Sequence, residues 1–163
     1  MTTAVLERDL EIVTQQLGRP VRDVVAIPAR CVCGAPTVVS TRPRLADGTP
    51  FPTFYYLTHP AATAAASRLE ASGRMAEYQA MLEGDVLEAY AAAHEAYLAD
   101  RARFGEVEEI AGISAGGMPT RVKCLHALIG HALAAGPGVN PIGDLALAEC
   151  GWSPEVCECV PLD

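Results

Sequence analysis

The spacing of apolar residues predicts a helix at the start of the chain and a small sheet after it. Apolar residues recur at helical intervals from Leu6 to Leu17, and Gly18 and Pro20 follow as a stop signal. Three segments rich in β-branched and aromatic residues come next, separated by Gly, Pro and Asp: VVAIPARCVCG, TVVSTRP and FPTFYYLT. Together they predict a sheet of about three strands.

From Pro60 onward the pattern becomes helical. Three alanine-rich segments end in glycine: PAATAAASRLEASG, RMAEYQAMLEG and VLEAYAAAHEAYLADRARFG. EVEEIAGI is ambiguous between a strand and a short helix. After a diglycine, Pro119 is predicted to open the helix RVKCLHALIGHALAA, which Gly136 closes. We expect GPGVNPIGD to form a rigid loop and DLALAEC a further short helix.

These elements predict an α+β fold: a mainly helical single domain with a small antiparallel sheet of about three strands in the N-terminal half, packed on helices. Its expected parts are an N-terminal helix (1–18), a β region (23–59), a helical region (60–150) and a cysteine-containing tail (151–163). A length of 163 residues suits one domain, and no repeat or linker divides it.

Composition and charge narrow the function classes. The net charge of −8, with one lysine, argues against nucleic-acid binding, which needs a basic surface. The first residues, MTTAVLERDL, lack the basic flank and apolar run of a signal peptide, and no window is apolar enough for a membrane span. We therefore expect a cytoplasmic protein, with no indication in the sequence of which protein partner it has.

Six cysteines are more than packing usually requires in a chain of this kind. Disulfides rarely persist in a reducing compartment, so metal ligands, redox thiols and buried small hydrophobic residues are the better interpretations.

One metal site is predicted from three separate segments. On a helical wheel at about 100° per residue, His126 lies about 160° around from Cys124, and His131 is about 10 Å along the axis from Cys124, so this helix supplies one ligand only. On an extended strand, Cys31 and Cys33 face the same way. The predicted Cys₃His set, suited to structural zinc, consists of Cys31, Cys33, His59 and Cys124. The alternative is that C-x-C marks two half-buried thiols on a strand.

A second cysteine set near the end of the chain has C-x₆-C-x-C spacing: Cys150, Cys157 and Cys159. It could hold a metal with a histidine or a solvent molecule, or donate a ligand to the first site. The interpretation we favour here is three exposed thiols on a frayed tail.

The segment GGMPTRVK indicates a possible site for a small anion. A diglycine before a helix start offers free backbone N–H groups, and basic residues in a first helical turn are unfavourable unless an anion compensates them. The candidate residues for a phosphorylated or carboxylated ligand are Arg30, Arg42, Arg44, Arg121, Lys123 and His126. The alternative is that these side chains are solvated or paired with the acidic middle helices. No P-loop, G-x-S-x-G, H-E-x-x-H or G-x-G-x-x-G motif is present.

Two stretches, RCVCGAPTVVSTRPRLADGTPFPTFYYLTHP and RVKCLHALIGHALAAGPGVNPIGD, resemble the Domain of Unknown Function 501 family, small proteins common in actinobacteria. The resemblance runs from about Asp23 to Asp144. It implies no settled activity; the neighbourhood of genes for a septum-formation protein and an exopolyphosphatase implies a context of cell division or phosphate metabolism. The family often has cysteine where this chain has His59, which suits a metal site and leaves an iron–sulfur cluster open as an alternative to zinc.

The sequence thus leaves three functional hypotheses. The first is a non-catalytic or regulatory metal-binding protein with structural zinc. The second is an enzyme or sensor for a small anionic ligand. The third is an iron–sulfur protein. Whether the protein is an enzyme is left open.

Overall fold

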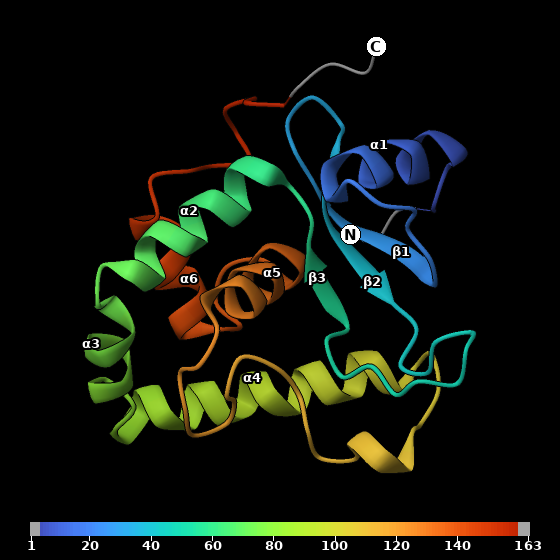
Figure 1. The fold of residues 1–163 in the computed structure, drawn as a ribbon. Coiled ribbons are helices and arrows are strands. Elements are labelled where there is room, and N and C mark those ends of the chain that lie inside the picture. The colour runs from blue at the N-terminus through green and yellow to red at the C-terminus, as the bar shows by residue number, and fades with distance from the viewer. Residues whose placement is uncertain (1–3, 160–163) are drawn as a thin grey trace.

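The structure, a computed structural model, describes residues 4–159 and confirms the predicted α+β fold (Figure 1). In chain order the elements are α1 (Glu7–Leu17), β1 (Val24–Arg30), β2 (Pro36–Thr41), β3 (Tyr55–Leu57), α2 (Pro60–Ala71), α3 (Arg74–Ala80), α4 (Gly84–Ala102), the 3₁₀ helix η1 (Glu108–Ile110), α5 (Leu125–Ala135) and α6 (Pro141–Glu149). None of the helices within residues 4–159 is both long and apolar enough to cross a membrane.

The three strands form one antiparallel sheet in the order β1-β2-β3. The central strand β2 is buried along its whole length because helices cover both faces of the sheet, α1 on one side and α5 on the other (Figure 1). Val39 of β2 and Ile27 of β1 pack with Val13 of α1. Val38 and the residues around β3 belong to the main core, which contains α5. The sheet is therefore the shared wall of two hydrophobic clusters.

Helix α5 is the centre of the main core. Leu125, Leu128 and Ile129 are fully buried, and α5 packs against α2, α6 and all three strands. Its sequence, LHALIGHALAA, is apolar nearly all round rather than on one stripe, which is typical of a helix surrounded by protein.

A buried histidine lies inside this core. The ring of His131 stacks on Tyr55 and meets Tyr97 edge-on, and its Nδ1 lies 3.1 Å from the side-chain amide nitrogen of Asn140. Burial lowers the pKa of His131 from 6.5 to about 4. The imidazole is therefore neutral at pH 7, and we interpret it as a core residue.

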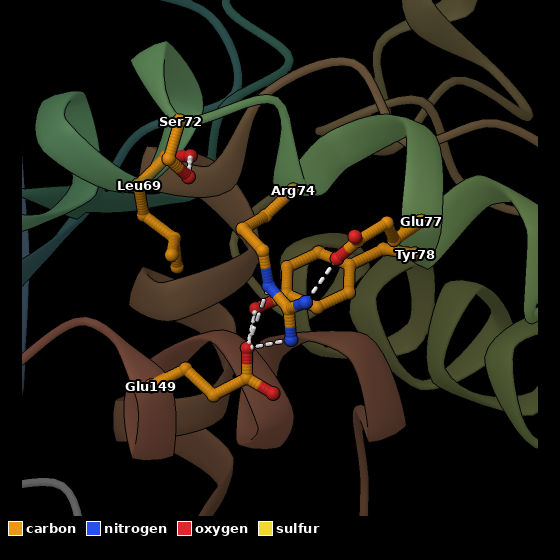
Figure 2. A network of polar contacts seen from close by, with 6 residues as sticks. All are labelled: Leu69, Ser72, Arg74, Glu77, Tyr78 and Glu149. Atoms are coloured by element: carbon orange, nitrogen blue, oxygen red, sulfur yellow. Dashed lines mark hydrogen bonds and ion pairs between the residues drawn. The ribbon is translucent and has the colours of Figure 1, made fainter.

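A polar network fixes the end of α6, from which the C-terminal segment departs (Figure 2). The Nε of Arg74 donates to Glu149 Oε2 at 3.0 Å, and the hydroxyl of Tyr78 donates to the same oxygen at 2.8 Å. Arg74 also pairs with Glu77 and lies over the Tyr78 ring. These contacts tie α6 to α3.

Two element boundaries differ from the prediction. Helix α5 begins at Leu125 rather than near Pro119, so that prediction was wrong. Helix α6 begins at Pro141, inside the segment expected to be a loop, because the Asn140 side chain accepts the Gly143 N–H at 2.9 Å and caps a helix start. The ambiguous EVEEIAGI segment contains the 3₁₀ helix η1.

Candidate metal centre

Four cysteines meet where the C-terminal segment returns to the sheet. The sulfurs of Cys31, Cys33, Cys157 and Cys159 all lie within 4.8 Å of one another. Cys33 and Cys159, 126 positions apart in the chain, have their sulfurs 3.5 Å apart. Figure 1 shows the C-terminal segment, in red, crossing from α6 to the turn between β1 and β2. We call these residues the four-cysteine cluster. It could hold a metal ion.

The first C-x-C lies in the hairpin turn after β1, not on an extended strand as predicted. Strand β1 ends at Arg30; Cys31 N then donates to Ala35 O at 2.8 Å, and Gly34 N donates to Cys31 O at 2.8 Å. Gly34 has φ 93°, a conformation that glycine adopts without strain. The turn, rather than strand alternation, brings the two thiols together.

Arg30 and Asp9 hold this turn against α1. One guanidinium nitrogen of Arg30 donates to Gly34 O at 2.9 Å and to the Asp9 carboxylate at 2.7 Å. The Asp9 side chain is buried, and its hydrogen bond with Arg30 holds the pKa of the carboxyl below its ordinary value. Arg30, predicted as an anion ligand, is thus engaged in bracing the turn.

The tail reaches the turn through a backbone contact and a buried aromatic residue. Val32 N donates to Pro154 O at 2.8 Å, and Trp152 is buried against the His59 ring. Cys150 is also buried, and its thiol hydrogen-bonds to backbone carbonyls rather than to another cysteine. Cys150 is therefore a packing residue, whereas its two predicted companions join the cluster.

His59 lies beside the four-cysteine cluster. It is the N-cap of α2, where its Nδ1 accepts the Ala62 N–H at 3.4 Å, and its Nε2 lies 3.1 Å from the Cys159 sulfur. Burial lowers the pKa of His59, which favours the neutral ring. Because Nδ1 accepts a hydrogen bond, Nε2 carries the proton and donates to the sulfur. The structure therefore places this predicted ligand as a hydrogen-bond donor to the cluster.

The four thiols differ in their electrostatic surroundings. Burial raises the pKa of Cys31 and of Cys159, whereas a hydrogen bond from the Ala35 backbone lowers the pKa of Cys33 to about 7. Cys33 and Cys157 are exposed, and a cavity of about 710 Å³ between the cluster and α1 is lined in part by Cys33, Cys157 and Cys159. An ion has an entry path from solvent.

A second group of potential ligands lies at the start of α5: Glu70, Cys124 and His126 have ligand atoms within 4.8 Å of one another. We call it the Glu-Cys-His cluster. His126 Nδ1 lies 3.1 Å from Glu70 Oε1. A hydrogen bond between Cys124 and His126 lowers the pKa of the thiol and raises the pKa of the imidazole.

Cys124 and His126 come together because the helix starts later than predicted. Cys124 is the N-cap of α5, with extended φ −148° and ψ 109°. The helical-wheel argument that separated the two residues therefore does not apply. The Lys123 and Cys124 amides donate to Gly116 O at 2.8 and 3.3 Å, which keeps this segment out of the helix. A Cβ on residue 116 would lie 2.6 Å from a Leu128 methyl carbon, so position 116 requires glycine.

Cys124 thus belongs to a different cluster from Cys31 and Cys33, so within residues 4–159 the structure does not bring the predicted Cys₃His set together. The predicted anion ligands are also dispersed. Arg44 pairs with Glu109 at 2.8 Å, while Arg42 is exposed on the loop after β2. Arg121 and Lys123 are exposed on the non-helical segment before α5, not in its first turn.

Sequence reasoning considered Cys157 and Cys159 but did not favour them, and it missed Glu70. A signal for the cysteines was available, because the chain contains C-x-C twice, at 31–33 and 157–159. Nothing comparable marks Glu70, an acidic residue on an alanine-rich helix with no motif around it.

Fold and site together define an α+β protein with a cluster of four cysteines that could hold a metal. Residues 27–148 match the family described as protein of unknown function DUF501, and the chain belongs to this family. No curated protein and no solved structure matches the chain. The matched region contains Cys31, Cys33 and the whole Glu-Cys-His cluster; Cys157 and Cys159 lie beyond it.

Proposed function

We propose that this protein is a metal-binding protein whose four-cysteine cluster holds one structural zinc ion. One observation carries the proposal: two C-x-C segments from opposite ends of the chain place four sulfurs within 4.8 Å of one another. Cysteine is seldom found in such groups without a metal or a disulfide to hold, and all six cysteines are free thiols here.

The spacing of the sulfurs supports a single ion over an iron–sulfur cluster. Zinc–sulfur bonds of about 2.3 Å in a tetrahedron put the sulfurs about 3.8 Å apart. In a cluster the irons and bridging sulfides lie between the cysteines, which pushes the cysteine sulfurs farther from one another. The separation of 3.5 Å between Cys33 and Cys159 suits the smaller site.

The surroundings suit the charge of such a site. Four thiolates around Zn²⁺ carry a net negative charge, and the Nε2–H of His59 donates to one of them. His59 is also the N-cap of α2, whose N-terminal dipole favours negative charge nearby.

Four thiolates complete the tetrahedron, so no position is left for water or substrate, and the role we propose is structural or regulatory. The zinc would fasten residues 151–159 to the β1–β2 turn, beside the backbone hydrogen bond from Val32 N to Pro154 O.

The test is elemental analysis of the full chain, purified without oxygen, together with its visible spectrum. We expect zinc and no iron-dependent colour, and we expect Cys33→Ser and Cys157→Ser each to lose one equivalent of zinc. Cys150→Ala, outside the cluster, is the matched control and keeps its zinc. Iron in the protein together with a visible absorption spectrum would show an iron–sulfur cluster and contradict the proposal of zinc. Unchanged metal content in both serine variants would also contradict the proposal.

Binding of a small anionic ligand is the second candidate function. It is favoured by the exposed side chains of Arg121 and Lys123, which form no ion pair with any residue in the described range 4–159. Thermal-shift measurements with phosphate esters, nucleotides and polyphosphate test it, since a ligand of the folded state raises the melting temperature. The shift should disappear in Arg121→Ala and persist in Arg22→Ala, an exposed arginine elsewhere; no shift with any of these ligands would exclude the function.

A further inference from the structure

The Glu-Cys-His cluster contains three types of metal ligand from two helix ends. Glu70 lies near the end of α2, Cys124 is the N-cap of α5, and His126 is in the first turn of α5. All three side chains are half-buried. The cluster is separate from the four-cysteine cluster and shares no residue with it.

One pair of ligand atoms in the cluster has a separation close to that of two ligands on one ion. His126 Nδ1 and Glu70 Oε1 are 3.1 Å apart. Zinc binds nitrogen and oxygen at about 2.0 to 2.2 Å, so two such ligands in a tetrahedron lie about 3.4 Å apart. A shift of a few tenths of an ångström would admit the ion.

In Glu70 and in His126, one polar side-chain atom has a hydrogen-bond partner outside the cluster. The other polar atom of each side chain remains for a metal ion. Glu70 Oε2 accepts the Leu125 N–H at 2.9 Å, which leaves Oε1. His126 Nε2 lies 3.1 Å from the Ser67 hydroxyl, which leaves Nδ1. Metal-binding histidines typically donate the other ring N–H to an oxygen, and metal-binding carboxylates are held by hydrogen bonds in the same way.

Cys124 is held in place by its backbone. Its amide donates to Gly116 O at 3.3 Å, and the close packing of Gly116 on Leu128 fixes that carbonyl. The thiol is thus presented at the helix start by the core of the protein rather than by a mobile loop.

We infer that Glu70, Cys124 and His126 form a second metal site, with three protein ligands and one open position. A thiolate, an imidazole and a carboxylate suit zinc or a similar transition metal rather than magnesium or calcium. Three protein ligands with an open fourth position are the arrangement of catalytic zinc, which binds water or a substrate oxygen there. The side chains of His126 and Glu70 are 32% and 23% exposed, so solvent reaches the site.

The experiment counts zinc bound to the full chain after removal of metal under reducing conditions and reloading with Zn²⁺. We expect about two ions per chain in the wild type and about one in either Cys124→Ser or Glu70→Gln. Both variants are conservative: serine is a favourable N-cap, and the glutamine carbonyl can still accept the Leu125 N–H. Glu77→Gln, on the exposed face of α3, is the control and keeps both ions.

Reloading with Co²⁺ gives a second measurement. In Cys124→Ser we expect the loss of the weaker thiolate-to-Co²⁺ absorption band, which comes from the single thiolate of the Glu-Cys-His cluster. In Cys157→Ser we expect the loss of the stronger thiolate bands of the four-cysteine cluster. Full zinc content in Cys124→Ser and Glu70→Gln, both folded by circular dichroism, would overturn the inference. Zinc lost from Cys124→Ser but not from Cys157→Ser would support this site and contradict the four-cysteine proposal, so the two failures are distinguishable.

Discussion

The four-cysteine cluster and the Glu-Cys-His cluster place metal ligands on different kinds of scaffold. The first joins a hairpin turn to the C-terminal segment across 126 positions of sequence. The second joins the end of α2 to the start of α5, and both helices pack in the main core. The first depends on the C-terminal segment meeting the turn, whereas the second lies between two helices that pack on each other.

The ligand sets also suit a structural role for the four-cysteine cluster and a ligand-binding role for the Glu-Cys-His cluster. Four sulfurs close a coordination sphere, while a sulfur, a nitrogen and an oxygen leave it open. An ion at the turn would therefore hold the chain together, and an ion at the start of α5 would be available to a further ligand. The comparison predicts that loss of zinc from the four-cysteine cluster lowers the stability of the fold. It also predicts that loss of metal from the Glu-Cys-His cluster lowers the affinity for added ligands.

The largest expected effect is the loss of stability when the four-cysteine cluster is broken. Zinc that binds only the folded state stabilises it by about 4 kcal/mol at a thousandfold excess over Kd. We expect Cys157→Ser to lose most of this increment and to become sensitive to protease within residues 151–159. Urea unfolding and limited proteolysis measure both.

Cys124→Ser is the matched comparison, since it removes one thiol from the other cluster. We expect its tail to stay protected. Equal loss of tail protection in the two variants would remove the contrast between the clusters.

Acidification comes next, because it acts on His131, which is buried inside the protein. The folded pKa of His131, about 4, lies below its unfolded value of 6.5. Between these pH values only the unfolded chain takes up the proton, so the free energy of unfolding falls by up to about 3 kcal/mol as the pH drops. Urea titrations of chelated protein at pH 7 and pH 4.5 measure the fall, and His131→Leu should show a smaller one. An identical fall in that variant would mean that other groups are responsible.

A smaller effect is expected from Asp9→Asn, which removes the carboxylate partner of Arg30 beside the β1–β2 turn. We expect a loss of about 2 kcal/mol at pH 7. Because the pKa of Asp9 is lowered in the folded state, its contribution is present above the unfolded pKa of 3.8 and is lost as the pH falls through the folded value. The difference from wild type should therefore shrink in acid.

In Asp9→Asn the two clusters are also expected to differ in their affinity for zinc. Asp9→Asn should weaken zinc binding at the four-cysteine cluster and leave the Glu-Cys-His cluster unchanged. Competition with a chelator, monitored by the Co²⁺ bands, measures the two affinities; equal weakening at both would contradict the local role of Asp9.

The smallest expected effect is that of Ser67→Ala, which removes the hydroxyl partner of His126. Loss of such a supporting hydrogen bond lowers metal affinity about tenfold. We expect this loss at the Glu-Cys-His cluster alone, measured by chelator competition, with Thr63→Ala on the same helix as control. An unchanged affinity would remove Ser67 from the account of this site.

Local signals in the sequence predicted the fold well. Gly18 ends α1 in the left-handed conformation, and Pro60 is the first residue of α2, both as expected. The start of α5 was wrong because the segment before it is held by hydrogen bonds to Gly116 O, and tertiary contacts of this kind leave no periodic pattern.

For the candidate sites too, features set by local sequence could be predicted and features set by tertiary contacts could not. Cys31 and Cys33 could be found because their spacing is local, but their partnership with Cys157 and Cys159 depends on the path of the tail past His59 and the β1–β2 turn. Glu70 meets His126 only because α2 packs on α5. Repetition of C-x-C is the one sequence feature that indicates either cluster in full.

X-ray absorption at the zinc edge of zinc-loaded Cys124→Ser protein tests the central claim most directly, because only the four-cysteine cluster remains intact in that variant. The account predicts four sulfur atoms at about 2.3 Å and no nitrogen or oxygen ligand. A mixed shell with two or fewer sulfurs, or no zinc at all in this variant, would contradict it.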